Sequence, residues 1–393
     1  MLLRHVAVTA IVSCALTGET AFFHAPGAVQ SSAVARAPVF EVDPFWPRPL
    51  PNHWVLGSTI GLAVDALDHV FILHRPATVD IELKAAAVDP PVGACCIPAP
   101  PVLEFDSQGN LLSSWGGAGR GYDWPAREHG LTVDPAGNIW IGGNDDKDSQ
   151  IVKFIRNGTF LMQIGRPGQK KGSNDKENFW RPAKVFIEPT ANEAYIADGY
   201  GNRRVVVVDA NTGAYKRHWG AYGAIPDDAP LPDYSPAAPP SKQFNTVHCA
   251  MVSRDGFVYV CDRVNDRIQV FRRDGAFVKE AFYDKATLRS GSVWDITFSR
   301  DPQQRYLYVA DGVNEKIRIV DRQTLEVLTS FGDGGRQPGQ FYGVHNLATD
   351  SKGNLYTTET YNGARVQRFI YRGERPVIRP EQGVPWPRRI PER

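Results

Sequence analysis

The sequence predicts an all-β fold: a six-bladed β-propeller with four-stranded antiparallel blades around a central channel. The pattern D-x-x-G-N followed by a hydrophobic and an aromatic residue returns along the chain, as in "DPAGNIW" and "DSKGNLY". Alignment on this pattern gives six units, whose inner strands begin near Leu62, Leu131, Val185, Ala250, Ile296 and Leu347. Each unit contains short runs rich in Val, Ile, Tyr and Trp, separated by Gly, Asp and Asn turns. These runs exclude helical repeats and are typical of propeller blades.

One closed repeat accounts for most of the 393 residues, so a second globular domain is not needed. We expect the propeller to occupy residues 37–373. Its last blade needs a strand from elsewhere, because an open sheet edge invites aggregation, and "APVFEVDPFW" (37–46) is the natural donor. The Pro- and Arg-rich tail, 374–393, is expected to pack as irregular chain or to be mobile. Insertions at 76–101 and 222–242 are expected to be loops that wall a substrate site.

Residues 1–36 are expected to be a signal peptide and a flexible leader. The apolar run from Val6 to Leu16 has the length of a signal-peptide core and is too short to span a bilayer. The protein is therefore expected to be secreted or periplasmic, with cleavage near the "AVA" at 33–35. Lipid anchoring at Cys14 is the alternative. No other segment is apolar and long enough for a transmembrane span.

Four further cysteines, an even number in an exported chain, suggest disulfides. Cys249 and Cys261 flank a hairpin centred on "RDG", at positions that make them cross-strand neighbours. They form either a disulfide or two buried thiols. The sequence leaves the state of the adjacent Cys95 and Cys96 open.

Charge and motifs exclude several classes of partner. The 44 basic and 43 acidic residues nearly balance, so there is no global field to attract nucleic acid or an anionic membrane. A Gly-rich phosphate loop is missing, which argues against an organic cofactor. We expect a monomer that acts on a small-molecule or peptide substrate.

Histidine recurs at one register of the repeat. The residues two positions before the six inner-strand starts are Ile60, His129, Ala183, His248, Trp294 and His345. Alternate blades of a six-bladed propeller are related by about 120°, so the three histidines should converge on the channel. Three neutral imidazoles arranged in this way form an open zinc site, although iron or cobalt would fit the same nitrogens. The alternative is that each histidine is structural and bonds to a backbone carbonyl. Threefold spacing favours the metal.

The segment "YVADGxxNxxIxIxD" resembles the NHL repeat. Over all six blades the chain resembles the peptidyl-α-hydroxyglycine α-amidating lyase family, on the motifs "HGLTVD", "ADGYGNRR", "VHCAMVSRDGFVYVCDRVNDRIQVF" and "VHNLATD". That family cleaves a peptidyl-α-hydroxyglycine to a peptide amide and glyoxylate at a zinc ion. The resemblance implies zinc ligands at His129, His248 and His345, and catalytic residues at Tyr200, Arg75 and Arg263.

The resemblance also implies a structural calcium ion, bound in part by the carbonyls of Leu62 and Leu131. The family has an Asp directly after the third histidine, whereas this chain has Asn346, a neutral ligand that should weaken calcium binding. Gly201 stands where the animal enzymes have a disulfide cysteine. The chain contains no copper monooxygenase domain to supply the hydroxylated substrate.

The chemistry of these residues leads to a similar function. Removing the hydroxyl proton of an α-hydroxy amide, a carbinolamide, lets its C–N bond break to give an aldehyde and an amide. Tyr200 is a candidate general base, and Arg75 and Arg263 could bind the carboxylate of glyoxylate. Each also has a structural interpretation, Tyr200 as a rim aromatic and Arg263 as a tie between blades. The alternative functions are a metal-dependent hydrolase such as a lactonase, and a non-catalytic NHL binding module.

Overall fold

The structure is a computed structural model that describes residues 34–387. The predicted signal-peptide core and Cys14 lie outside the described residues. Among the described residues, no helix is long and apolar enough to cross a membrane.

Six four-stranded antiparallel sheets form the blades, as the sequence predicted. Blade one contains β3 (Thr59–Val64), β4 (Val70–His74), β6 (Val102–Phe105) and β7 (Leu111–Trp115). Blade two contains β8 (Glu128–Val133), β9 (Ile139–Gly143), β10 (Gln150–Phe154) and β11 (Phe160–Gly165). Blade three contains β12 (Lys184–Glu188), β13 (Glu193–Asp198), β14 (Arg204–Asp209) and β15 (Tyr215–Trp219). Blade four contains β16 (Val247–Val252), β17 (Phe257–Asp262), β18 (Arg267–Arg272) and β19 (Phe277–Phe282).

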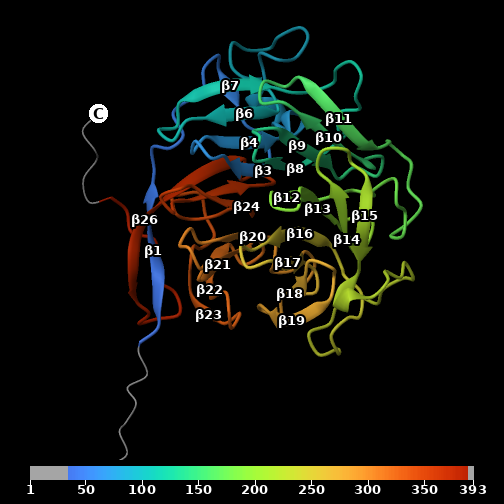
Figure 1. Cartoon of the computed structure of the whole chain (residues 1–393). Coiled ribbons are helices and arrows are strands. Elements are labelled where there is room, and N and C mark those ends of the chain that lie inside the picture. The colour runs from blue at the N-terminus through green and yellow to red at the C-terminus, as the bar shows by residue number, and fades with distance from the viewer. Residues whose placement is uncertain (1–33, 388–393) are drawn as a thin grey trace, which may run out of the picture. The chain divides into compact units, whose positions relative to one another are not determined.

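The last two blades follow the same order. Blade five contains β20 (Asp295–Phe298), β21 (Tyr306–Asp311), β22 (Lys316–Asp321) and β23 (Val327–Phe331). Blade six contains β24 (Val344–Thr349), β25 (Leu355–Glu359), β26 (Arg365–Pro376) and β1 (Arg36–Asp43). The first strands of consecutive blades, β3, β8, β12, β16, β20 and β24, neighbour one another in a closed ring. These six strands therefore line the channel (Figure 1).

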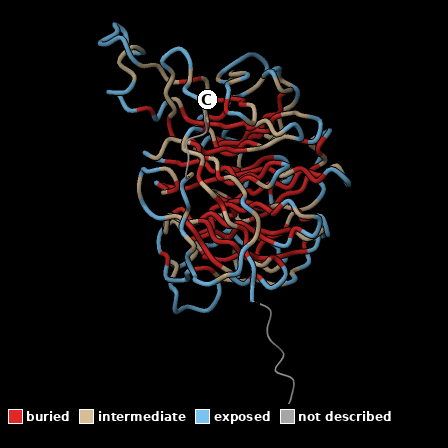
Figure 2. Tube along the Cα trace, turned by 90° about the vertical axis from the view of Figure 1, so that its left-hand side faces the viewer, coloured by how far each residue is buried: buried red, intermediate tan, exposed pale blue. Residues whose placement is uncertain are grey.

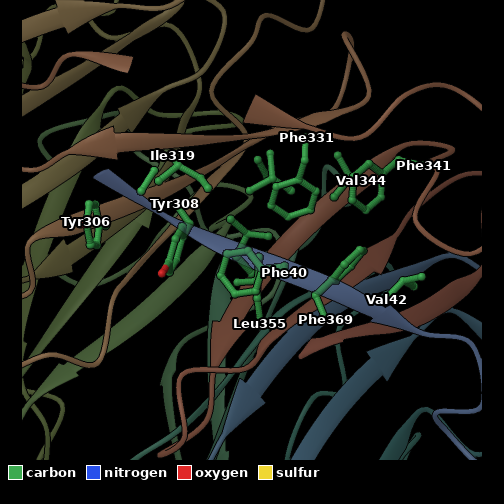
Figure 3. Close-up of a cluster of buried hydrophobic side chains, with 14 of the residues drawn as sticks. Phe40, Val42, Tyr306, Tyr308, Ile319, Phe331, Phe341, Val344, Leu355 and Phe369 are labelled. Carbon is green, nitrogen blue, oxygen red and sulfur yellow. The ribbon is translucent and has the colours of Figure 1, made fainter. Parts of the chain in front are cut away.

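The ring is closed by the N-terminal strand, which confirms the predicted donor. β1 pairs antiparallel with β26, and the two strands lie side by side in Figure 1. Phe40 of β1 is buried and packs edge-on against Tyr308 of blade five, with ring centroids 5.4 Å apart. Figure 3 shows Phe40 between side chains of blades five and six, among them Phe331 and Phe369. The first strand of the described chain thus buries its apolar face in the core that holds the last two blades together.

The repeat signature is a hydrogen-bonded turn between the first and second strands of a blade. In blade two the Asp134 carboxylate accepts the backbone N–H of Asn138 at 2.8 Å and its side-chain amide at 2.9 Å. The indole of Trp140 donates to the same carboxylate at 3.1 Å. Gly137 has φ +83°, a left-handed backbone that glycine adopts without strain. The recurring Asp, Gly, Asn and aromatic residues are therefore the parts of one turn, which sets where each inner strand lies.

Burial follows this architecture. Figure 2 shows buried residues along the strands and exposed residues in the loops. The first predicted insertion, 76–101, contains β5 (Ile97–Pro98) and two short 3₁₀ helices, Pro76–Thr78 and Ile81–Leu83. β5 pairs in parallel with β2 (Trp54–Val55), which precedes the insertion. The second predicted insertion, 222–242, begins within a 3₁₀ turn at Ala221–Gly223.

Two disulfides lie within the described residues. Cys249 on β16 pairs directly with Cys261 on β17, and the two are joined by a disulfide. This confirms the predicted cross-strand pairing and decides between the disulfide and the buried thiols. Cys95 and Cys96 are also joined to each other.

Beyond β26 the chain turns back onto the propeller. The carbonyl of Pro380 accepts the N–H of Ser330 on β23 at 2.8 Å, and the carbonyl of Pro385 accepts the N–H of Val42 on β1 at 3.2 Å. This segment of the tail covers the seam between blades five and six.

Candidate metal centre

The structure brings His129, His248 and His345 together in the channel. Their ring centroids form a nearly equilateral triangle with sides of 5.1, 5.0 and 4.9 Å. All three are buried, and one nitrogen of each lies within 4.8 Å of the other two. Within the described part of the chain, this is the one group of His, Cys, Asp or Glu side chains found close enough to hold a metal ion. The triad could therefore bind a metal.

β-Bulges turn these histidines into the channel. The strand pairing shifts register between His129 and Leu131 in blade two, between Val247 and Cys249 in blade four, and between Val344 and Leu347 in blade six. Blades three and five, which carry Ala183 and Trp294 at this register, pair their first two strands without a shift. A bulge adds one residue to a strand and re-aims a side chain. Blade one, which carries Ile60 at this register, has a similar shift between Thr59 and Gly61, so the bulge distinguishes the histidine blades from blades three and five only.

Each imidazole is held through Nδ1. His129 Nδ1 donates to the carbonyl of Ala183 at 2.8 Å, and His248 Nδ1 donates to the carbonyl of Trp294. His345 Nδ1 donates to the side-chain oxygen of Asn346 at 2.7 Å. Since all three acceptors are oxygens without a proton, each proton resides on Nδ1 and each Nε2 carries a lone pair. Hydrogen bonds of this kind, from the ring nitrogen that does not face the metal, orient histidines that ligate a metal.

Burial keeps the three imidazoles neutral. It lowers the pKa of His129 and His248 well below the ordinary value, because an imidazolium ion in the channel would lose its hydration. Burial also lowers the pKa of His345, to about 3. The hydrogen bond to Asn346 raises this pKa, whereas the positive charges of Arg75, Arg263 and Lys184 lower it further. Neutral imidazoles are the form that binds a metal ion.

Tyr200 lies directly against the triad. It belongs to the link between β13 and β14, and its hydroxyl oxygen is 3.0 Å from His129 Nε2 and 2.9 Å from His248 Nε2. Arg263 Nη1 donates to the same hydroxyl at 3.0 Å, and its guanidinium lies 5.2 Å from the centre of the Tyr200 ring. Arg263 Nε is buried without a hydrogen-bond partner. A donor left free in this way is available to a ligand of the site.

Arg75 lies near the same group, close enough for its positive charge to lower the pKa of His129 and of His345. Its Nε donates to the carbonyl of Glu128 at 2.8 Å and its Nη2 to the side-chain oxygen of Asn144 at 2.9 Å. Burial lowers its pKa to about 10, which still leaves the guanidinium charged at neutral pH. The three residues Tyr200, Arg75 and Arg263, predicted from motifs far apart in the chain, therefore gather at one end of the channel.

Sequence reasoning missed Arg181. Its Nε donates to the Asn144 carbonyl at 2.8 Å, and its guanidinium lies 5.7 Å from the centre of the Tyr200 ring, so it adds another positive charge. Its backbone has φ +60°, which no sequence pattern reveals. The one available signal is the Arg-Pro dipeptide that it shares with Arg75.

The residues considered for calcium lie on the inner strands. Leu62 on β3 and Leu131 on β8 are buried on neighbouring strands. Asn346 on β24 directs its oxygen to His345 and its amide nitrogen to Asp295, at 3.1 Å.

A cavity of about 550 Å³ opens beside Tyr200. The predicted second insertion supplies Leu231 and Tyr234 to its wall, and Arg203 and Leu288 face them from other loops. The 222–242 loop and Tyr200 therefore line the same cavity.

The fold and the site define a class of protein: a six-bladed propeller with three histidines at one register of its inner strands. The chain is similar to peptidyl-glycine α-amidating monooxygenase B of Xenopus laevis, at 29% identity over 246 residues, which cover 61% of this chain and 25% of the relative. It is also similar to NHL repeat-containing protein 3 of Mus musculus, at 24% identity over 364 residues, 90% of this chain and 86% of the relative.

A third relative is peptidyl-α-hydroxyglycine α-amidating lyase 1 of Drosophila melanogaster, at 22% identity over 64% of this chain and 46% of the relative. These similarities confirm the resemblance to the amidating enzymes and to NHL-repeat proteins. The match spans about a quarter of the length of the amidating monooxygenase. A solved streptogramin B lyase shares the fold, with a TM-score of 0.50 and 12% identity over 84% of this chain and 98% of that one. No family model matches the chain.

Proposed function

We propose that this protein is an exported, zinc-dependent carbon–nitrogen lyase that cleaves an α-hydroxy amide to an amide and glyoxylate or a related aldehyde. The observation that carries the proposal is the placement of the Tyr200 hydroxyl, 3.0 and 2.9 Å from Nε2 of His129 and His248 and 3.0 Å from Arg263. A proton-transfer group thus lies beside three metal-binding nitrogens and a guanidinium. The similarity to an α-amidating lyase supports the same reaction class.

Tyr200 takes the part of the general base. It accepts the proton of the substrate's hydroxyl group, the carbon–oxygen bond becomes a carbonyl, and the C–N bond breaks with its electron pair going to nitrogen. The amide nitrogen then takes up a proton, so that the products are an amide and an aldehyde. Zinc, when bound by the three Nε2 atoms, supplies a Lewis acid that lowers the pKa of a nearby hydroxyl group. Arg263 donates a hydrogen bond to the Tyr200 oxygen and fixes the position of that hydroxyl group beside the histidines.

Arg75 and Arg263 bind the carboxylate of the substrate's glycine part. Arg263 keeps a buried Nε–H without a partner, and Arg75 is fixed by Glu128 and Asn144. Planar guanidinium groups suit a planar carboxylate, and buried charge-assisted bonds are the strong ones. An α-hydroxy amide with a free carboxylate is therefore the preferred substrate class.

The two disulfides support export, because disulfides persist in oxidising compartments. Together with the leader, they favour a secreted or periplasmic protein. Mass spectrometry of the mature chain from the medium or periplasm tests this, and an intact N-terminus in the cytoplasm would contradict it.

Release of glyoxylate from α-hydroxyhippurate by the zinc-loaded protein tests the reaction. We expect turnover of this compound, and weaker turnover of its methyl ester, which lacks the carboxylate charge. A panel of lactones assayed beside it separates a lyase from a hydrolase. Turnover of lactones without glyoxylate release would overturn the proposal, and so would inactivity of metal-loaded, folded protein on both substrate classes.

A further inference from the structure

A buried ion pair crosses the channel between two blades that carry no histidine. Lys184 begins β12 of blade three, and Asp295 begins β20 of blade five. Lys184 Nζ lies 2.8 and 2.6 Å from the two carboxylate oxygens of Asp295. The exposed fraction is 8% for Lys184 and 0% for Asp295. Burying two charges is costly unless they are paired and further hydrogen-bonded, so a pair at this depth needs additional partners.

Asp295 has those partners in blade six. Its Oδ2 accepts the side-chain amide of Asn346 at 3.1 Å and the backbone N–H of Leu347 at 3.0 Å. Asn346 in turn accepts the Nδ1–H of His345 at 2.7 Å. A chain of hydrogen bonds therefore runs from the Lys184 ammonium through Asp295 and Asn346 to His345.

The same pair adjoins the supports of the other two histidines. Lys184 directly follows Ala183, whose carbonyl holds His129. Asp295 directly follows Trp294, whose carbonyl holds His248. One ion pair thus adjoins the two residues whose backbone carbonyls orient His129 and His248, and it reaches His345 through the side chain of Asn346.

The donors around this pair fit an ammonium ion better than a divalent cation. The side-chain oxygen of Asn346 is already bonded to His345, and its amide nitrogen, a donor, faces Asp295. Calcium prefers several oxygen ligands, carboxylates above all, and the Asp295 carboxylate is neutralised on both oxygens by Lys184. A divalent cation placed beside Asn346 and Asp295 would meet a fixed positive charge.

We propose that the ammonium of Lys184 is the resident cation of this channel, and that through Asp295 and Asn346 it holds His345 in its metal-binding orientation without calcium. Lys184 is then a positioning residue. The claim that His345 is held without calcium rests on the ion pair alone. The claim that Lys184 affects metal binding by the three histidines rests on the proposed function.

Calcium dependence is the first test. Wild-type protein is dialysed against a calcium chelator or against millimolar calcium, and its Tm is measured in each. We expect wild-type protein to have the same Tm in both conditions. In the double variant Lys184→Ala, Asn346→Asp, two carboxylates face a gap with no positive charge, so its Tm should rise with calcium. A wild-type Tm that falls on chelation and returns with calcium would overturn the proposal, whatever the activity of the enzyme.

Zinc affinity is the second test. Lys184→Met keeps the length of the side chain and removes its charge, and Lys153→Met is the matched control. Lys153 has the same 8% exposure and pairs with Asp134 at 3.2 Å, outside the triad's support. We expect Lys184→Met to weaken zinc binding by roughly 10- to 100-fold, as for other residues that support the ligands of a metal, and Lys153→Met to leave it unchanged. Equal affinities in both variants would contradict the positioning role. If Lys184→Met does not fold, the calcium test on wild-type protein still decides the proposal.

Discussion

The Nδ1 of His129 donates to the carbonyl of Ala183 at 2.8 Å, and these two residues occupy the same register in consecutive blades. The same relationship joins His248 to Trp294. His345 of blade six differs, because its Nδ1 donates to the side-chain oxygen of Asn346 in its own blade. Two of the three imidazoles are therefore oriented by a backbone carbonyl of the following blade.

Replacing Tyr200 by Phe tests the general base. The variant keeps the aromatic ring and loses the hydroxyl that contacts two imidazoles and Arg263. We expect kcat to fall by about 10²- to 10⁴-fold, the usual range for a general base, with zinc content unchanged. Tyr342→Phe, at an exposed position, is the control. Loss of activity accompanied by loss of zinc would instead indicate that Tyr200 holds the site together.

Metal-free protein should lose stability in mild acid. The pKa of His345 is lowered to about 3 by burial, and those of His129 and His248 are also lowered, while each is about 6.5 in the unfolded chain. The unfolded state therefore binds more protons below pH 6.5. The stability is fully present above that pH and declines as the pH falls towards 3. Each histidine contributes a slope of at most about 1.4 kcal/mol per pH unit.

Urea denaturation of metal-free protein at several pH values measures this slope. His345→Gln should make the slope shallower between pH 6.5 and about 4. The same substitution at the exposed His53 should leave it as it is. Identical slopes in wild type and His345→Gln would mean that His345 is not held neutral by the fold.

The closing strand should carry a large share of stability. Phe40 on β1 is buried between Tyr308 and Phe331, so Phe40→Ala should lower the free energy of unfolding by about 3–5 kcal/mol. Glu41→Ala removes a surface contact with Arg372 on the same pair of strands and should cost about 1 kcal/mol or less. Similar costs for the two variants would show that β1 does not anchor the last blade.

The Cys249–Cys261 disulfide should stabilise blade four. It closes a loop with a sequence separation of 12, and removing a disulfide that closes a loop of this size lowers the free energy of unfolding by roughly 3 kcal/mol. The double variant Cys249→Ala, Cys261→Ala should lower the denaturation midpoint accordingly. The double variant of Cys95 and Cys96, which are adjacent and enclose almost no chain, should change it less. The opposite order would contradict this account.

The fold and the convergence of the triad could be predicted because both follow from local repetition. Asp134, Asn138 and Trp140 form a turn that recurs in register, so counting from it placed His129 on the channel. The closing strand was predictable because an open edge is unfavourable. In both cases a short sequence pattern carries the information.

The supports of the site could not be predicted, because they depend on contacts between distant blades. Lys184 and Asp295 are 111 residues apart, and neither belongs to a motif. Arg181 reaches Tyr200 through a left-handed backbone conformation that is set by its surroundings.

Metal content is the measurement that tests the central claim most directly. Purified wild-type protein and the triple variant His129→Ala, His248→Ala, His345→Ala are compared by elemental mass spectrometry, with circular dichroism to show that both are folded. The account predicts about one zinc ion per wild-type chain and none in the variant, as for an open three-histidine site. Folded wild-type protein that takes up no metal even when zinc is supplied, or a variant that retains as much as the wild type, would contradict it.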